Sequence, residues 1–160
     1  MGEAVDMSTR YLKPADVRAM VVYLRSVTRI AATDLPAPKS TPAPAAHPLA
    51  GKDDFAQRGQ LIYAGACAGC HGWTGVTSLV PLASLTGCRT VNDPTAINVA
   101  QVIMHGAKRA SSDPTRNMPA FGDTYTNDEV ASIANFVIAR YGAQASELTA
   151  GRVAQLRRED

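Results

Sequence analysis

Apolar side chains recur at helical spacing in several stretches of the chain, with polar side chains on the opposite face. Val17, Val21 and Leu24 show the pattern in the first stretch, because residues three and four apart lie on one face of a helix. No segment alternates between apolar and polar residues as a half-buried strand does. The chain is therefore predicted to be all-α, with helices over residues 14–30, 53–67, 94–106 and 126–142.

Two of these helices carry end signals in the sequence. The last helix can be capped by Thr126 or Asn127, has acidic residues in its first turn and Arg140 in its last turn, and is followed by a glycine. The third helix is predicted to begin close to Pro94 and to stop at Gly106. These residue types predict where the two helices begin and end.

A Pro/Ala-rich stretch interrupts the helical pattern and suggests a division of the chain. Its sequence, LPAPKSTPAPAAHP, favours extended polyproline geometry and the behaviour of a semi-stiff linker. The predicted organisation therefore has four parts. They are a remnant closing helix of a preceding domain (1–34), the linker (35–50), the main domain (51–143) and a C-terminal tail (144–160).

The assignment of residues 1–34 depends on an internal similarity. When Val17 is aligned with Val130, Met20 falls on Ile133 and Leu24 falls on Val137. The first helix is therefore predicted to be the closing helix of an earlier copy of the same domain. The other interpretation is a chance resemblance between two amphipathic helices.

Composition and charge exclude several classes of protein. Of 160 residues, 46% are hydrophobic and 19% are charged, which is typical of a globular chain. The formal charge of +2 offers no basic footprint for nucleic acid. No apolar run is long enough to span a membrane, and the first ten residues lack a charged-then-apolar signal pattern.

The motif Cys67-Ala-Gly-Cys70-His71 is the strongest chemical signal in the sequence. On a helix, two thiols three residues apart lie side by side, and the adjacent imidazole can reach a group that they hold. Each thiol can add to one vinyl group of a porphyrin while the imidazole binds the iron, and CxxCH is the signature of c-type haem attachment. The motif predicts one covalently bound haem c.

Two other uses of the same cysteines remain open at this point. A thioredoxin-like dithiol would stand at a strand-to-helix junction, and no strand is predicted before Cys67. A zinc site could combine Cys67, Cys70 and Cys88 with a histidine, although the spacing matches common zinc sites poorly.

A second iron ligand is expected from the stretch NMPAFGD. Met118 lies in a loop, and Pro119 disfavours helical backbone at the residue before it, so the thioether can project toward the metal. The other candidates are His105 and Met104 on the preceding helix and His47 in the linker. Met104 is more typical of core packing.

A His71/Met118 pair occupies both axial positions of the iron, and the soft thioether favours the ferrous state. Such a centre exchanges single electrons and has no vacant position for a substrate, so the sequence predicts an electron carrier and not an enzyme. The alternative is a peroxidase-like enzyme in which Met118 detaches.

These motifs resemble those of class I c-type cytochromes, over residues 51–143. The resemblance rests on RGQLIYAGACAGCHG, then VPL, NMPAFGD and the closing helix DEVASIANFVIARYG. It implies a small all-α fold in which the first and last helices of the domain cross beside the haem. It also implies that the carbonyl of Pro81 receives the second N–H of His71. Cys88 departs from the family pattern.

More narrowly, the chain resembles the C-terminal end of multi-haem cytochrome subunits of membrane-bound bacterial dehydrogenases. That resemblance implies a dehydrogenase subunit as electron donor and quinone, an oxidase or another cytochrome as acceptor. Membrane association would come only through partners or further segments. It also implies a periplasmic location, for which a signal sequence would have to precede residue 1. In that family Met1 or Met7 could match the ligand of a preceding haem.

Overall fold

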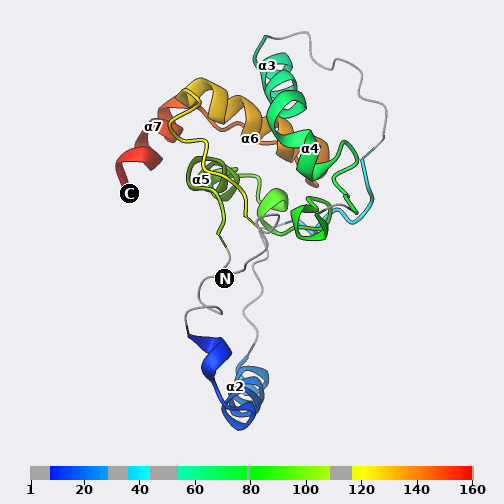
Figure 1. Ribbon diagram of the computed structural model, residues 1–160, viewed down its shortest axis with the longest axis vertical. Helices are drawn as coiled ribbons and strands as arrows, with labels where there is room; N and C mark the ends of the chain where they lie inside the picture. Colours follow the sequence, from blue (N-terminus) through cyan, green and yellow to red (C-terminus); the bar gives the residue numbers. More distant parts are fainter. Residues whose placement is uncertain (1–7, 29–35, 44–53, 79, 109–116, 160) are drawn as a thin grey trace.

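The computed structural model describes residues 8–28, 36–43, 54–78, 80–108 and 117–159. Within these residues there is no strand, only an isolated antiparallel bridge between Ala107 and Met118. The prediction of an all-α chain is confirmed (Figure 1). In chain order the elements are η1 (Thr9–Tyr11), α2 (Pro14–Ser26), α3 (Asp54–Ile62), η2 (Tyr63–Cys67), α4 (Ala68–His71), η3 (Pro81–Ala83), η4 (Thr90–Asn92), α5 (Ile97–His105), α6 (Asn127–Tyr141) and α7 (Ala150–Glu159).

The crossing of α3 and α6 is the centre of the fold. Gly59 of α3 lies so close to α6 that a methyl group in its place would overlap the backbone carbonyl of Ser132. Just beyond the crossing, the ring of Tyr63 lies 5.2 Å from that of Phe136 and 5.7 Å from that of Tyr141, measured between centroids. A small residue at the contact point therefore allows aromatic side chains to pack on its C-terminal side.

Helix α6 contributes more residues to the buried core than any other described helix, and it is capped as its sequence predicts. Thr126 is its N-cap and forms a reciprocal capping box with Glu129. Hydrogen bonds from the backbone and hydroxyl of Thr126 hold the pKa of Glu129 below its ordinary value. The helix packs against α3, α5 and α7 and buries eight of its residues: Val130, Ala131, Ser132, Ile133, Ala134, Val137, Ile138 and Tyr141.

The third helix begins later than the sequence indicates. The segment 94–96 forms a turn, and α5 starts at Ile97. The carboxylate of Asp93 accepts hydrogen bonds from the backbone N–H and the hydroxyl of Thr95. This local hydrogen bonding competes with helix formation, and Ala96 takes a left-handed conformation before α5 begins.

The C-terminal tail belongs to the globular unit. Residues of the segment 144–160 form α7, which packs on α6 and buries Leu148, Val153 and Leu156. The division that treated residues 144–160 as separate from the main domain is therefore not seen in the structure. Burial of these three apolar side chains is the physical reason.

Part of the Pro/Ala-rich stretch also contacts this unit. Residues 36–43 form neither helix nor strand, yet the N–H of Ala43 donates to the carbonyl of Thr74 over 2.9 Å and the Ala43 side chain is buried. The N–H of Lys39 donates to Asn92 over the same distance. These residues are therefore bound to the domain, while residues 44–50 lie outside the described part of the chain.

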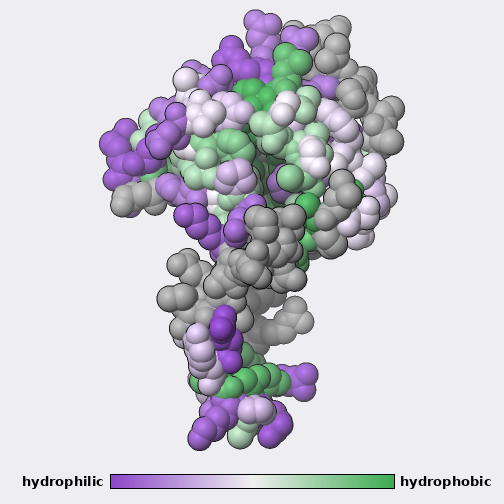
Figure 2. Space-filling model, viewed as in Figure 1, coloured by the Kyte–Doolittle hydropathy of each residue, from purple (hydrophilic) through white to green (hydrophobic). Residues whose placement is uncertain are grey.

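Helix α2 lies apart from the other helices (Figure 1). None of its residues is buried, and the side chains of Val17, Met20 and Leu24 are 44%, 47% and 67% exposed. Figure 2 shows apolar atoms at the surface in this part of the molecule. Among the described residues, no helix combines the length and apolarity needed to cross a membrane.

Candidate functional site

The cysteine motif lies where the helical backbone after α3 changes its geometry. Tyr63–Cys67 form a π-helical turn, and Ala68–His71 continue as a short α-helix. Single π-helical turns are frequent at functional sites. Both motif cysteines are free thiols; Cys67 packs partly buried against the core, and Cys70 is exposed. The turn therefore presents two unpaired sulfurs and one imidazole within five consecutive positions.

A single hydrogen bond orients the imidazole of His71. Its Nδ1 lies 2.6 Å from the carbonyl oxygen of Ala83, at the end of η3. Because a carbonyl only accepts, Nδ1 carries the hydrogen, and the neutral ring keeps its lone pair on Nε2. That nitrogen is the one available to a metal.

This geometry corrects the expectation for Pro81. The resemblance implied that the Pro81 carbonyl would accept from His71, but the acceptor is Ala83, two residues further along. Residues 81–83 form one 3-10 turn, and Ala83 N–H donates to the carbonyl of Val80 over 2.8 Å. The turn brings its last carbonyl, and not its first, to the ring.

The backbone after His71 is held by side chains from α6 and η2. The hydroxyl of Tyr63 donates to the carbonyl of Gly72 over 2.7 Å. Arg140 donates to the carbonyl of Trp73 from Nε (3.1 Å) and from Nη2 (2.9 Å), and the Tyr141 hydroxyl lies 3.3 Å from each of these two carbonyls. The exit of the motif is therefore bound to the helix crossing.

The ionisation of Cys67 argues against a redox dithiol. Burial, and secondarily the nearby Cys70, raise the pKa of the Cys67 thiol to about 11. Cysteines that exchange disulfides have lowered pKa values, since the thiolate is the nucleophile. The structure also has a helix and not a strand before the motif. Both observations disfavour the thioredoxin-like interpretation.

The loop that carries Met118 is attached to the end of α5. Met118 and Ala107 exchange two backbone hydrogen bonds of 2.8 and 3.0 Å, and the N–H of Phe121 donates to Ile103 over 2.9 Å. Gly106, which directly follows α5, has φ +71°. A methyl group at this position would overlap the carbonyl oxygen of Met118. The base of the loop can therefore close only around a glycine.

The residues that follow Met118 lie near the cysteine motif. Phe121 and Tyr125 stack with their ring centroids 5.8 Å apart. Burial raises the pKa of the Tyr125 hydroxyl, and the nearby Cys67 thiol is the second cause. Met118 itself is partly buried and packs against the same hydrophobic core as Cys67. The fold thus brings both predicted halves of the site to one core.

Of the other candidate ligands, the structure describes Met104 and His105. Met104 is 3% exposed and packs in the core, and His105 is exposed at the end of α5. His47, Met1 and Met7 lie outside the described residues. In the described part of the chain, no three His, Cys, Asp or Glu side chains are grouped to hold a metal ion.

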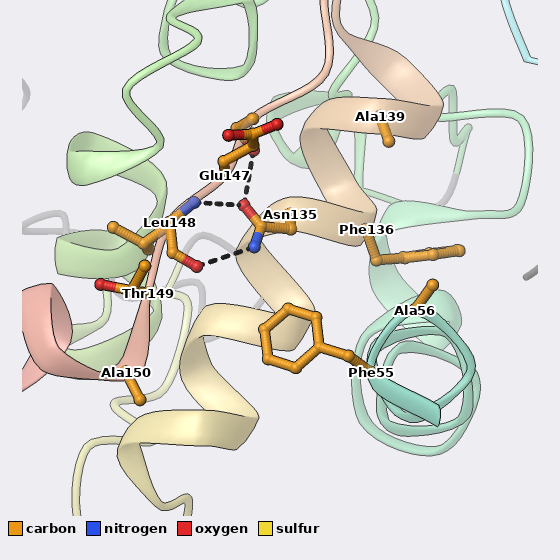
Figure 3. Close-up of a pocket in the computed structure, with 10 residues that line it drawn as sticks. Phe55, Ala56, Asn135, Phe136, Ala139, Glu147, Leu148, Thr149 and Ala150 are labelled. Carbon is orange, nitrogen blue, oxygen red and sulfur yellow. Dashed lines mark hydrogen bonds between the residues drawn. The ribbon is translucent and has the colours of Figure 1, made fainter. Parts of the chain in front are cut away.

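A surface pocket of about 690 Å³ is separate from these residues (Figure 3). It lies between α3, α6 and the segment before α7. In its lining, the side chain of Asn135 forms two hydrogen bonds with the backbone of Leu148. None of the predicted ligand residues lines it. The lining residues are Phe55, Ala56, Asn135, Phe136, Ala139, Ser146, Glu147, Leu148, Thr149 and Ala150.

The donor atoms present fit a covalently bound haem. Cys67 and Cys70 supply two free thiols for two vinyl groups. His71 keeps a ring nitrogen available because its other nitrogen is bound to Ala83. Met118 supplies a thioether from a loop fixed by α5.

Comparison with known proteins agrees with this chemistry. Residues 54–137 match the family described as cytochrome c oxidase, cbb3-type, subunit III. The match covers more than half of the chain, and the chain belongs to this family. It is a c-type cytochrome, as the sequence predicted, and transfer of electrons through haem is the function of this class.

The chain is also similar to cytochrome subunits of dehydrogenases. It is 29% identical to the fructose dehydrogenase cytochrome subunit of Gluconobacter japonicus, over 98% of this chain and 36% of that protein. It is 29% identical to the gluconate 2-dehydrogenase cytochrome c subunit of Pantoea cypripedii, over 100% of this chain and 37% of that protein. A nicotinate dehydrogenase subunit of Pseudomonas putida is 28% identical over 91% of this chain and 12% of that protein. The chain thus spans just over a third of the length of the first two relatives.

Several residues that hold the site cannot be recognised from the sequence. Ala83 acts through its carbonyl, which no residue type encodes. Arg140 was placed in the last turn of its helix, where a basic residue is usual, and its bonds to Trp73 required the tertiary structure. Tyr63 offered a partial signal, since a buried tyrosine hydroxyl usually finds a partner.

The contact at Gly106 predicts a specific loss of stability. Gly106→Ala should lower the free energy of unfolding of the haem-loaded protein by about 3 kcal/mol, because it adds backbone strain and a clash with Met118. Gly87→Ala is the matched control, since Gly87 has φ +76° with no atom within 4 Å, and should cost about 1 kcal/mol. Chemical denaturation measures both. Equal losses would contradict the importance of the contact.

Proposed function

We propose that this chain carries one haem c, attached through Cys67 and Cys70, with His71 and Met118 as the axial ligands of the iron. The observation that carries the proposal is the hydrogen bond from His71 Nδ1 to the carbonyl of Ala83. This bond leaves the lone pair of Nε2 available to coordinate the iron. When bound, the haem supplies a reversible ferric–ferrous couple. The unit relays single electrons.

The chain's own residues act by position and not by reaction. Ala83 fixes the tautomer and direction of the His71 ring. Tyr63 and Arg140 hold the backbone that follows the ring. If His71 and Met118 both bound the iron, no coordination position would remain for a substrate, and the unit would act as an electron carrier and not as an enzyme.

We propose that the donor is a dehydrogenase subunit and that the acceptor is quinone, an oxidase or another cytochrome. The names of the two relatives similar over nearly the whole chain support a dehydrogenase partner, since both are cytochrome subunits of dehydrogenases. Covalent haem attachment in this family supports a periplasmic location. Binding to the membrane would then come through partners or further segments.

We further propose that α2 is the closing helix of a second cytochrome unit. Met20 and Leu24 of α2 align with Ile133 and Val137 of α6, which are 1% and 6% exposed, whereas the two α2 residues are about half exposed or more. The face of α2 that corresponds to the buried face of α6 is thus exposed. The division between the two units would then lie between α2 and the segment 36–43, which contacts the main unit.

Amide hydrogen exchange tests the assignment of α2. In the 160-residue chain the α2 amides should exchange much faster than those of α6, because α2 has no buried face. In a longer chain that also carries the second unit, the α2 amides should become protected. Fast exchange in both chains would contradict the proposal.

Covalent attachment has a direct test. The protein is denatured and run on a gel that is stained for haem. The parent chain and Cys88→Ala should keep the haem on the polypeptide, because Cys88 is not in the attachment motif. The double variant Cys67→Ala/Cys70→Ala should keep none. Release of haem from the parent chain would refute covalent attachment.

The axial role of Met118 is tested with two volume-conserving changes. Met118→Leu should abolish the near-infrared sulfur-to-iron band of the ferric protein and lower its reduction potential, because the thioether is lost. Met104→Leu, in the core, should keep both. Cyanide should bind the ferric parent slowly and Met118→Leu rapidly. Rapid binding by the parent would favour the peroxidase-like alternative with a displaceable methionine.

A further inference from the structure

Helix α7 places one arginine against the turn that follows Met118. Val153 and Leu156 fix the helix to the core, with 0% and 2% of each residue exposed. The next residue, Arg157, directs its guanidinium to three acceptors. Nε donates to Asn127 Oδ1 over 2.7 Å, Nη1 to the Gly122 carbonyl over 2.7 Å, and Nη2 to the Tyr125 carbonyl over 2.8 Å.

The turn that Arg157 binds is also the end of the Met118 loop. The N–H of Gly122 donates to the carbonyl of Met104 over 3.0 Å, while its own carbonyl accepts from Arg157. The peptide backbone at Gly122, four residues after Met118, is thus held between α5 on one side and α7 on the other. A shift of this turn would therefore move the loop that carries the sulfur.

The chemistry of this contact suits an arginine. All three distances are short, as expected for hydrogen bonds with a charged donor. The planar guanidinium can reach separate acceptors from fixed directions, whereas the ammonium of lysine is a single point of charge. The acceptors are two backbone carbonyls and one side-chain amide, so Arg157 here holds backbone geometry and does not neutralise a carboxylate.

We propose that Arg157 is a positioning residue for the axial methionine: it fixes the turn at residues 122–125 and thereby keeps the Met118 thioether directed at the iron. The inference rests on the proposed function, in which Met118 is an iron ligand. It concerns the strength of that ligation, and with it the resistance of the iron to external ligands and its reduction potential.

The test compares variants of the full haem-loaded protein. Arg157→Gln removes the charge and two of the directed donors, and Arg157→Lys keeps the charge. Arg152→Gln is the matched control, because Arg152 lies on the same helix and its guanidinium bonds to Gln155 and Glu159 of that helix. Three quantities are measured: the intensity of the sulfur-to-iron band, the rate of cyanide binding to the ferric protein, and the reduction potential.

We expect Arg157→Gln to weaken the band, to lower the potential and to speed cyanide binding about tenfold, as loss of one charged hydrogen bond would. Arg157→Lys should lie between it and the parent, and Arg152→Gln should match the parent. If Arg157→Gln keeps the band, the cyanide rate and the potential of the parent, the inference is overturned.

A further variant distinguishes a positioning role of Arg157 from an effect on stability alone. Leu156→Ala loosens the packing of α7 but leaves the guanidinium donors in place. If Leu156→Ala lowers the melting temperature as much as Arg157→Gln and speeds cyanide binding equally, Arg157 acts only through stability and the inference fails. If Arg157→Gln does not fold, Asn127→Ala is used instead. It removes one acceptor of the Arg157 guanidinium and should produce a smaller change in the same direction. The inference would then be overturned if both Asn127→Ala and Arg157→Lys behaved like the parent.

Failure of the proposed function has a different signature. If the parent protein lacks the sulfur-to-iron band, or if Met118→Leu keeps it, Met118 is not the ligand and the proposed function falls. If the parent shows the band, Met118→Leu loses it and the Arg157 variants remain parent-like, only the role of Arg157 is rejected.

Discussion

The hydrogen bond between His71 Nδ1 and the carbonyl of Ala83 is the contact on which the chemistry of this site depends. A carbonyl accepts and never donates, so this contact assigns the ring hydrogen to Nδ1 and leaves Nε2 as a donor for iron. The two residues are twelve positions apart. The bond therefore forms only when the segment after the cysteine motif has folded back as the turn η3, and the direction of the imidazole is a property of the folded chain.

Two arginines have similar relations to the two sides of the site. Arg140 of α6 binds the carbonyl of Trp73, just after the histidine. Arg157 of α7 binds the carbonyls of Gly122 and Tyr125, just after the methionine loop. In both cases the helix itself contains no predicted iron ligand, but its arginine fixes the backbone that follows a predicted ligand. Guanidinium groups suit this use because they bond to several oxygens from one plane and stay charged.

The sequence was most informative where the chemistry is local. The CxxCH motif, the Met-Pro loop and the capped helix α6 depend on neighbouring residues, and family membership and the helical fold confirm the class that they indicated. It was less informative where distant contacts decide. The Pro81 carbonyl was expected to accept from His71, but the acceptor is Ala83. The hydrogen bonds of Asp93 make α5 begin later in the chain than the sequence indicates.

What the sequence alone determined is the identity of the reactive atoms: two thiols, an imidazole and a candidate thioether at fixed places in the chain. Their chemistry is carried by side-chain type and short spacing, which survive without tertiary structure. Only the fold decided which carbonyl orients the ring, that α7 belongs to the same unit, and that Arg157 lies against the turn after Met118. Backbone carbonyls are identical at every residue, so nothing in the sequence distinguishes Ala83 or Gly122 until packing brings a donor to it.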